Sequence, residues 1–307
     1  MSHRSGLTQQ WFIRRIGIPM SKFQDWLKRY GQANRHNGKN PRSWWILESE
    51  KNAIIEFCRE RISEGYRRLA YIMIDEDIVA VSPSTVYRVL KDNGLLYRWN
   101  TKTSTGKGKG FKQPKGPNKH WHVDIAYINV MGTFMFLISV LDGFSRMIVH
   151  HELRTTMAEY DVQITIQRAL EKYPGVHPRL ITDNGKQFIA KEFKEFLRSC
   201  GLKHVRTSVY YPQSNGKIER FHGTIKSEAI RKQSYLSTDD ARRQIEDYIR
   251  IYNEERLHSA LCYLTPKEVF EGKMRERLAE RQNKLDQAVE YRKNLSLFER
   301  VENSISL

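Results

Sequence analysis

The sequence contains little cysteine and no long apolar stretch. Its three cysteines, Cys58, Cys200 and Cys262, lie far apart, without a CxxC pair or a neighbouring pair of histidines. This pattern gives no sign of a disulfide framework or a zinc finger and fits a reducing compartment. No apolar run approaches the roughly 18 residues that span a bilayer, and the N-terminus lacks a secretory signal pattern. We therefore expect a cytoplasmic protein with no membrane partner.

Acidic residues are scarce in the N-terminal third. Residues 1–119 contain 23 Lys and Arg against 10 Asp and Glu, so +13 of the formal net charge of +17 lies there. A polyanion is the simplest partner for such a segment, and nucleic acid fits better than a membrane because the chain has no spanning stretch. A merely soluble basic surface is the alternative.

Two helical units are predicted ahead of residue 99. Residues 1–45 contain short helices interrupted by a glycine and a proline, and residues 46–98 contain a second helical unit. Ser82 followed by Pro83 is a strong helix start in the second unit. Both units favour a helix-turn-helix, although any small helical hairpin has the same apolar alternation. The exposed side of the last helix would offer groups suited to phosphates and base edges: Ser84, Thr85, Tyr87, Arg88 and Lys91.

Two further segments flank a central region at residues 120–270. Residues 99–119 contain six lysines and no acid, which predicts a flexible basic linker that either follows a phosphate backbone or serves only as a spacer. Residues 271–307 form a charged helical tail. Its apolar positions are too few to distinguish a solvated helix from one that binds a partner.

The central region changes from helical to strand periodicity. Residues 121–128 and 133–153 are rich in β-branched and aromatic residues, and Asp142-Gly143 predicts a turn, so we expect three antiparallel strands. A helix, a short strand ending at Asp183, another helix and another strand follow, which predicts a parallel pair. The fold class is therefore α/β, with a mixed five-stranded sheet flanked by helices and preceded by all-α units.

Three acids of this region are candidates for one site. Asp124 is embedded in a strand that otherwise reads as buried, and Asp183 ends a parallel strand, where α/β sheets gather ligands. On its own, Asp183 is better explained as a turn residue, with Asn184 and Gly185. Glu219 lies in the first turn of a helix whose apolar stripe can pack on the sheet. Three carboxylates converging on one point need cations, and their oxygens suit magnesium or manganese.

The order and spacing of these motifs resemble a known family. Asp124, Asp183 and Glu219, with 35 residues between the last two, resemble the D,D(35)E series of retroviral integrases and related transposases, whose core is RNase H-like. The segments that carry the resemblance are HWHVDIAYI, LDGFSR, ITDNGKQF and YYPQSNGKIERFHGTIK. The helical units and YIRIYNEERLHSALCYLTPKEVF are similar to OrfB-type transposases of the insertion-sequence family numbered three. The resemblance covers residues 48–270 and includes no His-His-Cys-Cys zinc module.

The resemblance implies a DNA transposase, a polynucleotidyl transferase that binds the ends of an insertion sequence and catalyses metal-dependent cleavage and strand transfer. It implies two Mg²⁺ or Mn²⁺ ions, with Asp124 bridging both and Asp183 and Glu219 each completing one coordination sphere. It also implies DNA contacts from residues around the helix of Glu219: Tyr210, Gln213, Ser214, Asn215, His222 and Lys226.

Partners follow from the same resemblance. We expect double-stranded DNA, namely the terminal repeats and the target, and a homo-oligomer of at least two copies in a nucleoid-associated bacterial complex. An upstream protein of the same element could be a further partner. The segment Arg256-Leu257-His258-Ser259 could be a DNA contact or a helix terminus. A catalytically silent DNA-binding protein or repressor is the alternative function, while an RNase H-type nuclease would leave the helix-turn-helix units unexplained.

Overall fold

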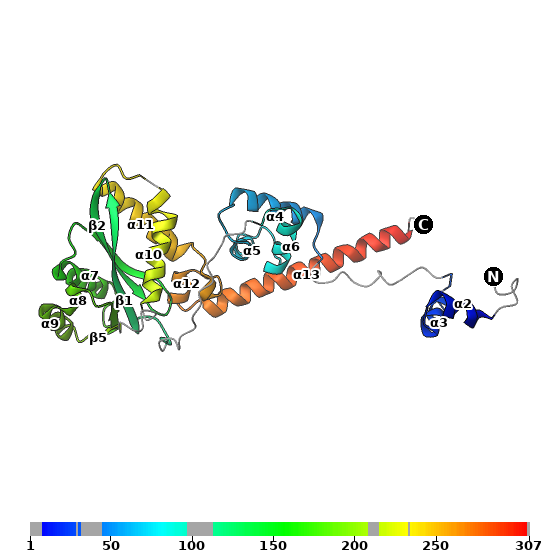
Figure 1. The fold of residues 1–307 in the computed structure, drawn as a ribbon, viewed down its shortest axis with the longest axis horizontal. Coiled ribbons are helices and arrows are strands. Elements are labelled where there is room, and N and C mark those ends of the chain that lie inside the picture. The colour runs from blue at the N-terminus through cyan, green and yellow to red at the C-terminus, as the bar shows by residue number, and fades with distance from the viewer. Residues whose placement is uncertain are drawn as a thin grey trace. The chain divides into compact units, whose positions relative to one another are not determined.

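The computed structural model describes residues 8–28, 30–31, 45–96, 113–207, 215–232 and 234–305. Its contacts divide the chain into two compact units, Met1–Glu50 with Asp286–Leu307 and Lys51–Leu285 (Figure 1). The predicted basic linker at 99–119 is described only from residue 113 onward. The division into five domains stays a prediction.

The first unit contains the helices α2 (Gln9–Ile16) and α3 (Met20–Lys28). Thr8 caps α2 because its side chain accepts a hydrogen bond from the Trp11 N–H, and Gly17 ends the helix with a φ of 75°. The two predicted short helices are therefore present. The same unit contains the C-terminal half of the long helix α13 (Met274–Ile305), which confirms a helical tail.

The second unit begins with most of the helix α4 (Glu48–Glu60), followed by α5 (Tyr66–Asp75) and α6 (Pro83–Asp92). Ser82 caps α6 by accepting a hydrogen bond from the Thr85 N–H at 3.3 Å, with Pro83 in the first helical position. The predicted helix start is confirmed. A small core fixes the three helices, with these side chains at most 1% exposed: Ile54, Leu69, Met73, Val86 and Leu90.

A five-stranded sheet follows in the same unit. Its strands are β1 (His120–Val130), β2 (Thr133–Asp142), β3 (Ile148–Arg154), β4 (Arg179–Thr182) and β5 (Lys203–Arg206). The order is β3-β2-β1-β4-β5, with β1, β2 and β3 antiparallel and β4 and β5 parallel to β1. The buried Asp142 carboxylate accepts hydrogen bonds from Phe144 N–H at 3.1 Å and Ser145 N–H at 2.7 Å, which fixes the turn into β3.

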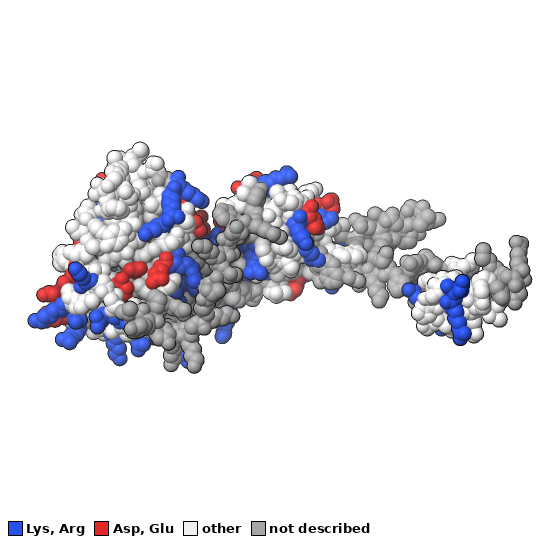
Figure 2. Space-filling view, viewed as in Figure 1, with Lys and Arg blue, Asp and Glu red and all other residues white. Residues whose placement is uncertain are grey.

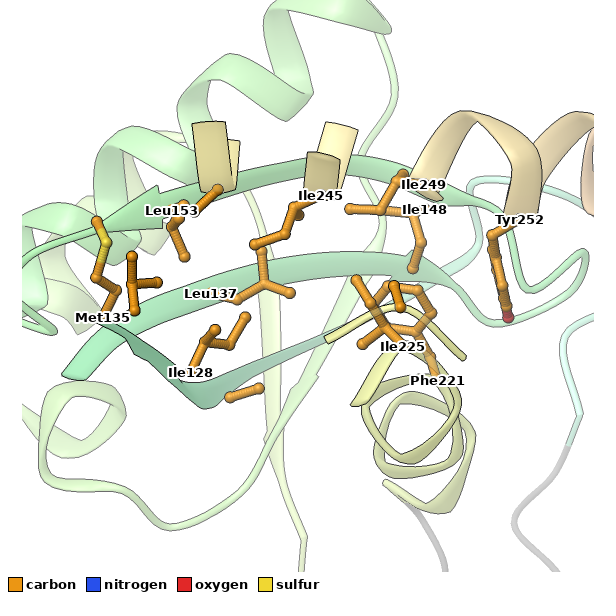
Figure 3. Close-up of a cluster of buried hydrophobic side chains, with 14 of the residues drawn as sticks. Ile128, Met135, Leu137, Ile148, Leu153, Phe221, Ile225, Ile245, Ile249 and Tyr252 are labelled. Atoms are coloured by element: carbon orange, nitrogen blue, oxygen red, sulfur yellow. The ribbon is translucent and has the colours of Figure 1, made fainter. Parts of the chain in front are cut away.

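Helices cover both faces of the sheet, because alternate strand residues point to opposite sides. One face packs against α7 (Glu159–Lys172), α8 (Lys186–Ile189) and α9 (Lys191–Ser199) through a cluster that includes Trp121 and Val123. The other face packs against α10 (Gly216–Glu228) and α11 (Thr238–Glu254). Figure 3 shows this second core, in which Ile128 and Leu137 of the sheet meet Phe221, Ile225 and Ile249 of the helices.

The short helix α12 (Pro266–Phe270) and the first half of α13 complete the second unit. Arg281 of α13 is 3% exposed and donates hydrogen bonds to the Asp75 carboxylate at 2.8 Å and to the Tyr263 carbonyl at 2.8 Å. This part of α13 is therefore tied to the end of α5 and to the segment before α12. Within the described ranges, no helix is long and apolar enough to cross a membrane.

Candidate active site

Two of the predicted acids are brought level by the parallel pairing of β1 and β4. His122 of β1 lies opposite Ile181 of β4, and Asp124 and Asp183 each stand two residues further along. Residues level with each other on parallel strands project toward the same face. Asp183 directly follows β4, and its Oδ1 accepts a hydrogen bond from the Gly185 N–H at 2.9 Å. Asp183 therefore both follows the carboxyl end of β4 and begins a turn.

Glu219 reaches the same place from α10. The helix buries Ile218, Phe221 and Ile225 against the sheet, which turns the first-turn acid toward the strand ends. Partial burial, followed by the charges of Asp124 and Asp183, raises the pKa of the Glu219 carboxyl above its ordinary value. The three carboxylates therefore act on one another electrostatically, although they come from a strand, a strand end and a helix.

His222 holds the central acid in place. It is 7% exposed, its Nδ1 lies 3.3 Å from Oδ2 of Asp124, and its Nε2 lies 3.2 Å from the Ser139 hydroxyl. Asp124 and Ser139 are direct partners across β1 and β2. The prediction of His222 as a DNA contact is corrected here, because the ring is enclosed between the helix and the sheet. Its place four residues after the buried Ile218 was the signal that could have revealed this.

Asn215 is also buried rather than offered to a ligand. It is 2% exposed, and its Oδ1 lies 3.4 Å from Nδ1 of His122. Burial, followed by the charge of Lys217, lowers the pKa of His122 to about 4, so this imidazole is neutral at pH 7. The buried placement of Asn215 corrects the expectation of a DNA-facing loop residue at that position. Tyr210, Gln213 and Ser214 lie outside the described residues.

Lys226 lies half-buried two turns beyond Glu219 on α10. In α6, Ser84, Tyr87, Arg88 and Lys91 are exposed as predicted, but Thr85 is only 4% exposed. The Thr85 hydroxyl lies 3.0 Å from that of Ser82 and accepts a hydrogen bond from Arg88. The expectation that Thr85 faces DNA is therefore wrong, because its side chain completes the capped first turn of the helix.

The three carboxylates have the chemistry of a magnesium or manganese site, since both ions prefer hard oxygen ligands. Asp124 and Asp183 each have an oxygen held by a neighbour, Asp124 by His222 and Asp183 by Gly185. Across the parts of the chain that the structure describes, no three acidic, histidine or cysteine groups are grouped closely enough to hold a metal ion. The three carboxylates therefore fit such an ion in the chemistry of their oxygens and in the electrostatic coupling of Glu219 to Asp124 and Asp183, while their spacing here is wider than in a formed metal site.

Comparison with known proteins identifies the family. Two family models described as the integrase core domain match residues 114–212 and residues 200–266. The transposase of insertion sequence element IS904 from Lactococcus lactis subsp. lactis is 30% identical over 184 residues, which cover 56% of this chain and 72% of the relative. The chain belongs to the integrase-core transposases of insertion sequences. This confirms the resemblance to DDE transposases that the sequence motifs predicted.

Other relatives of this transposase also come from insertion elements. The InsD transposase of insertion element IS2 from Escherichia coli is 28% identical over 217 residues, covering 66% of this chain and 72% of the relative. An uncharacterised protein of insertion element IS407 from Burkholderia multivorans is 26% identical and covers 70% of this chain and 78% of the relative. The transposase is thus a polynucleotidyl transferase of the transposase and integrase type.

Solved structures similar to the transposase include viral integrases. A simian T-cell lymphotropic virus intasome, in complex with a regulatory subunit of PP2A, has 16% identity and a TM-score of 0.48, covering 71% of this chain and 74% of that one. The HTLV-2 integrase catalytic core in complex with magnesium has 20% identity and a TM-score of 0.43, and the match covers 51% of this chain and 98% of that one. The strand order of the transposase and its integrase-core match confirm the RNase H-like fold class.

Proposed function

We propose that this transposase cleaves DNA at the ends of its insertion sequence and joins the freed ends to target DNA, with Asp124, Asp183 and Glu219 as the catalytic carboxylates. The observation that carries the proposal is geometric: β1 and β4 bring Asp124 and Asp183 level, and α10 packs on the sheet with Glu219 in its first turn. Partial burial, followed by the charges of Asp124 and Asp183, raises the pKa of the Glu219 carboxyl, which agrees with this arrangement. Three elements brought from distant parts of the sequence thereby concentrate negative charge at the carboxyl end of β4, where α/β sheets bind ligands.

Two Mg²⁺ or Mn²⁺ ions are the proposed cofactors, with Asp124 shared and Asp183 and Glu219 on either side. Such ions, when bound, neutralise the carboxylates and the charge that develops on a phosphodiester under attack. The chain's own contribution is orientation. His222 and Ser139 fix Asp124, the Gly185 N–H fixes Asp183, and the packing of α10 fixes Glu219.

The exposed face of α6 is the proposed site for recognising the DNA sequence at the ends of the element. Ser84 and Tyr87 can meet base edges, while Arg88 and Lys91 can meet phosphates. The proposed partners are the terminal repeats, the target DNA and at least one further copy of the chain, since joining two ends in one complex needs two sites. A nucleoid-associated complex in the cytoplasm, with an upstream protein of the same element, completes the proposal.

A strand-transfer assay tests this function. The protein is mixed with duplexes carrying the element's terminal repeats and a target plasmid, in Mg²⁺ or in Mn²⁺, and joined products are counted. Glu219→Gln removes one metal-binding charge with little change in shape, and Glu195→Gln on the exposed side of α9 is the matched control. We expect joining by the wild type and by Glu195→Gln, and none by Glu219→Gln.

Two outcomes contradict the proposal. Equal joining by the wild type and Glu219→Gln would show that the site is elsewhere. Specific binding of the repeats without joining by the wild type, in either metal, would favour the alternative of a catalytically silent repressor. Mg²⁺ and Mn²⁺ are added separately, because a site made only of carboxylates accepts both ions.

A further inference from the structure

A small basic pocket lies along α10, the helix that carries Glu219. Its volume is about 150 Å³, and five cationic side chains from four parts of the second unit line it. Lys217 and Arg220 come from α10, on either side of Glu219 in the sequence. The remaining three come from the turn between β2 and β3, the end of α11 and the helix α5: Arg146, Arg256 and Arg68. In Figure 2, basic and acidic atoms lie side by side near α10 on the face shown.

The positive charge of the pocket is only partly balanced. No Asp or Glu lines it. Arg256 has a carboxylate partner in Glu228, with Nη2 2.7 Å from Oε1, and Arg68 pairs with Glu64. Lys217 donates to the side-chain oxygen of Gln113 at 2.6 Å and to the Gly143 carbonyl, both uncharged acceptors.

The two remaining cationic groups of the pocket are the guanidinium groups of Arg146 and Arg220. Neither Arg146 nor Arg220 has a side-chain hydrogen bond or an ion pair within the described ranges, although Arg146 is half-buried. Buried arginines normally meet a carboxylate or a phosphate, because removing the charge from water is costly without a partner. The pocket therefore contains donors for an anion that the chain itself does not supply.

The pocket is rigid where Arg146 enters it. Arg146 has a φ of 65°, in the left-handed region, and its N–H donates to the Asp142 carbonyl at 2.8 Å. The buried Asp142 carboxylate holds the same turn through Ser145. The opposite wall is formed by Tyr252, which is 3% exposed, and His258, whose rings lie 4.7 Å apart. A non-glycine residue held in this conformation indicates a turn fixed by its surroundings.

The pKa values of two residues that line the pocket, His258 and Arg146, agree with an anion site. Burial, followed by the charges of Arg256, Arg146 and Arg68, lowers the pKa of His258 to about 3, so the ring is neutral and adds no charge at pH 7. Burial and the neighbouring Arg220 lower the pKa of Arg146 from its ordinary value. Burial is the larger cause of both shifts, and repulsion among the cations, which a bound anion would relieve, adds to it.

We propose that this pocket binds one phosphate of the DNA backbone, next to the strand that reaches the carboxylates, and so sets the register of the DNA end. This inference rests on the proposed function, since Lys217, Arg220 and Glu219 all lie in the first two turns of α10, so DNA held at the carboxylates passes within about one helix diameter of the pocket. Arg146 and Arg220 supply planar, charge-assisted hydrogen bonds. Phosphate contacts of this kind position a duplex without reading its sequence.

A phosphate-neutralisation scan tests the pocket. Terminal-repeat duplexes carry a single uncharged methylphosphonate at successive backbone positions, and their affinities are compared for wild type, Arg146→Gln and Arg220→Gln. Lys191→Gln on the exposed side of α9 is the charge-matched control. We expect one position at which the methylphosphonate weakens wild-type binding roughly tenfold, as for one lost charged hydrogen bond. The same position should have no effect in Arg146→Gln and the full effect in Lys191→Gln.

A second measurement separates the pocket from DNA binding and from catalysis. Inorganic phosphate, compared with chloride at equal ionic strength, should raise the melting temperature of the wild type but not of Arg146→Gln or Arg220→Gln. Glu219→Gln should keep the methylphosphonate pattern while losing strand transfer, so failure of the pocket and failure of the proposed function are distinguishable. Arg220 is exposed, which keeps the test valid if Arg146→Gln does not fold.

The remaining outcomes overturn the proposal. If phosphate stabilises the wild type through Arg146 but no backbone position depends on that residue, the pocket binds a free anion and not DNA. If neither measurement depends on Arg146 or Arg220, the pocket binds no phosphate at all.

Discussion

Nδ1 of His222 lies 3.3 Å from Oδ2 of Asp124, and the other ring nitrogen of His222 lies 3.2 Å from the hydroxyl of Ser139. A helix residue thereby joins two residues that face each other across β1 and β2. The other oxygen of Asp124, Oδ1, accepts a hydrogen bond from the Ile125 N–H at 2.9 Å, so His222 orients the oxygen that the backbone does not hold. The contact makes His222 a positioning residue for the proposed catalytic centre.

The first prediction concerns that contact. His222→Ala should lower strand transfer by roughly 10- to 100-fold, as for other residues that orient a metal-binding side chain, while leaving DNA affinity unchanged. The concentration of Mg²⁺ that gives half-maximal activity should rise, which a purely structural defect would not cause. Ser139→Ala should show a smaller shift in the same direction. An unchanged Mg²⁺ dependence in His222→Ala would contradict the positioning role.

The second prediction separates two neighbours on α6. Arg88→Gln should weaken DNA binding and reduce the slope of log affinity against log salt by about 1, because one phosphate contact is lost. Thr85→Val should leave that slope unchanged and lower the free energy of unfolding by about 1 kcal/mol, since it removes a buried hydroxyl with two partners. Fluorescence anisotropy at several salt concentrations and urea unfolding supply the measurements. A salt-insensitive wild-type complex would exclude the basic N-terminal third as a phosphate-binding surface.

The third prediction concerns pH. Burial, followed by the charges of His150 and Lys172, lowers the pKa of His151 to about 4. Above pH 6.5 the ring is neutral in both states and contributes nothing. As the pH falls from 6.5 toward 4, the unfolded chain binds a proton that the folded chain does not, so stability decreases by up to about 1.4 kcal/mol per pH unit.

His151→Asn should therefore flatten the decrease in unfolding free energy between pH 6.5 and 4. His177→Asn, at an exposed position, is the control and should keep the wild-type slope. The pKa of His122 is likewise lowered to about 4, so part of the decrease in unfolding free energy remains in His151→Asn. Equal slopes in all three proteins would show that His151 titrates normally.

The fourth prediction concerns the attachment of α13. The Arg281 side chain is 4% exposed and lies between the Asp75 carboxylate and the carbonyls of Cys262 and Tyr263. Arg281→Met leaves the Asp75 carboxylate with its remaining ion pair to Arg277, 3.3 Å away, and should lower the free energy of unfolding by about 2 kcal/mol. It should also speed proteolysis within residues 274–307.

Two comparisons sharpen that test. Adding Asp75→Asn to Arg281→Met should recover part of the loss, because it removes a charge that has lost one of its two cationic partners. Arg250→Ala, which breaks an exposed pair with Glu255, should cost less than about 1 kcal/mol. A similar cost for the buried and the exposed pair would contradict the anchoring role of Arg281.

The sequence by itself determined the elements and the identity of the acids. Local chemistry decides these features: Ser82 and Pro83 start a helix wherever the chain is free to form one, and alternating apolar residues from Trp121 onward form strands in any context. No knowledge of packing was needed to recognise the spacing of Asp124, Asp183 and Glu219 or to predict the turn at Asp142. The five-stranded sheet, its parallel pair and its helical layers follow from these local patterns.

Only the tertiary structure decided which polar side chains face inward. His222, Asn215 and Thr85 are residue types that often bind ligands, yet each is buried against another part of the chain. The partners of His222 and Asn215 are distant in the sequence, Asp124 and His122, and the partner of Thr85 is Ser82, the cap of the same helix. The basic pocket is likewise absent from any sequence window, because Arg146, Arg220 and Arg256 approach one another only when the β2–β3 turn, α10 and the end of α11 pack together. Periodicity can indicate that a side chain such as His222 is buried, but the partner that it meets and the density of charge around it are properties of the packed chain.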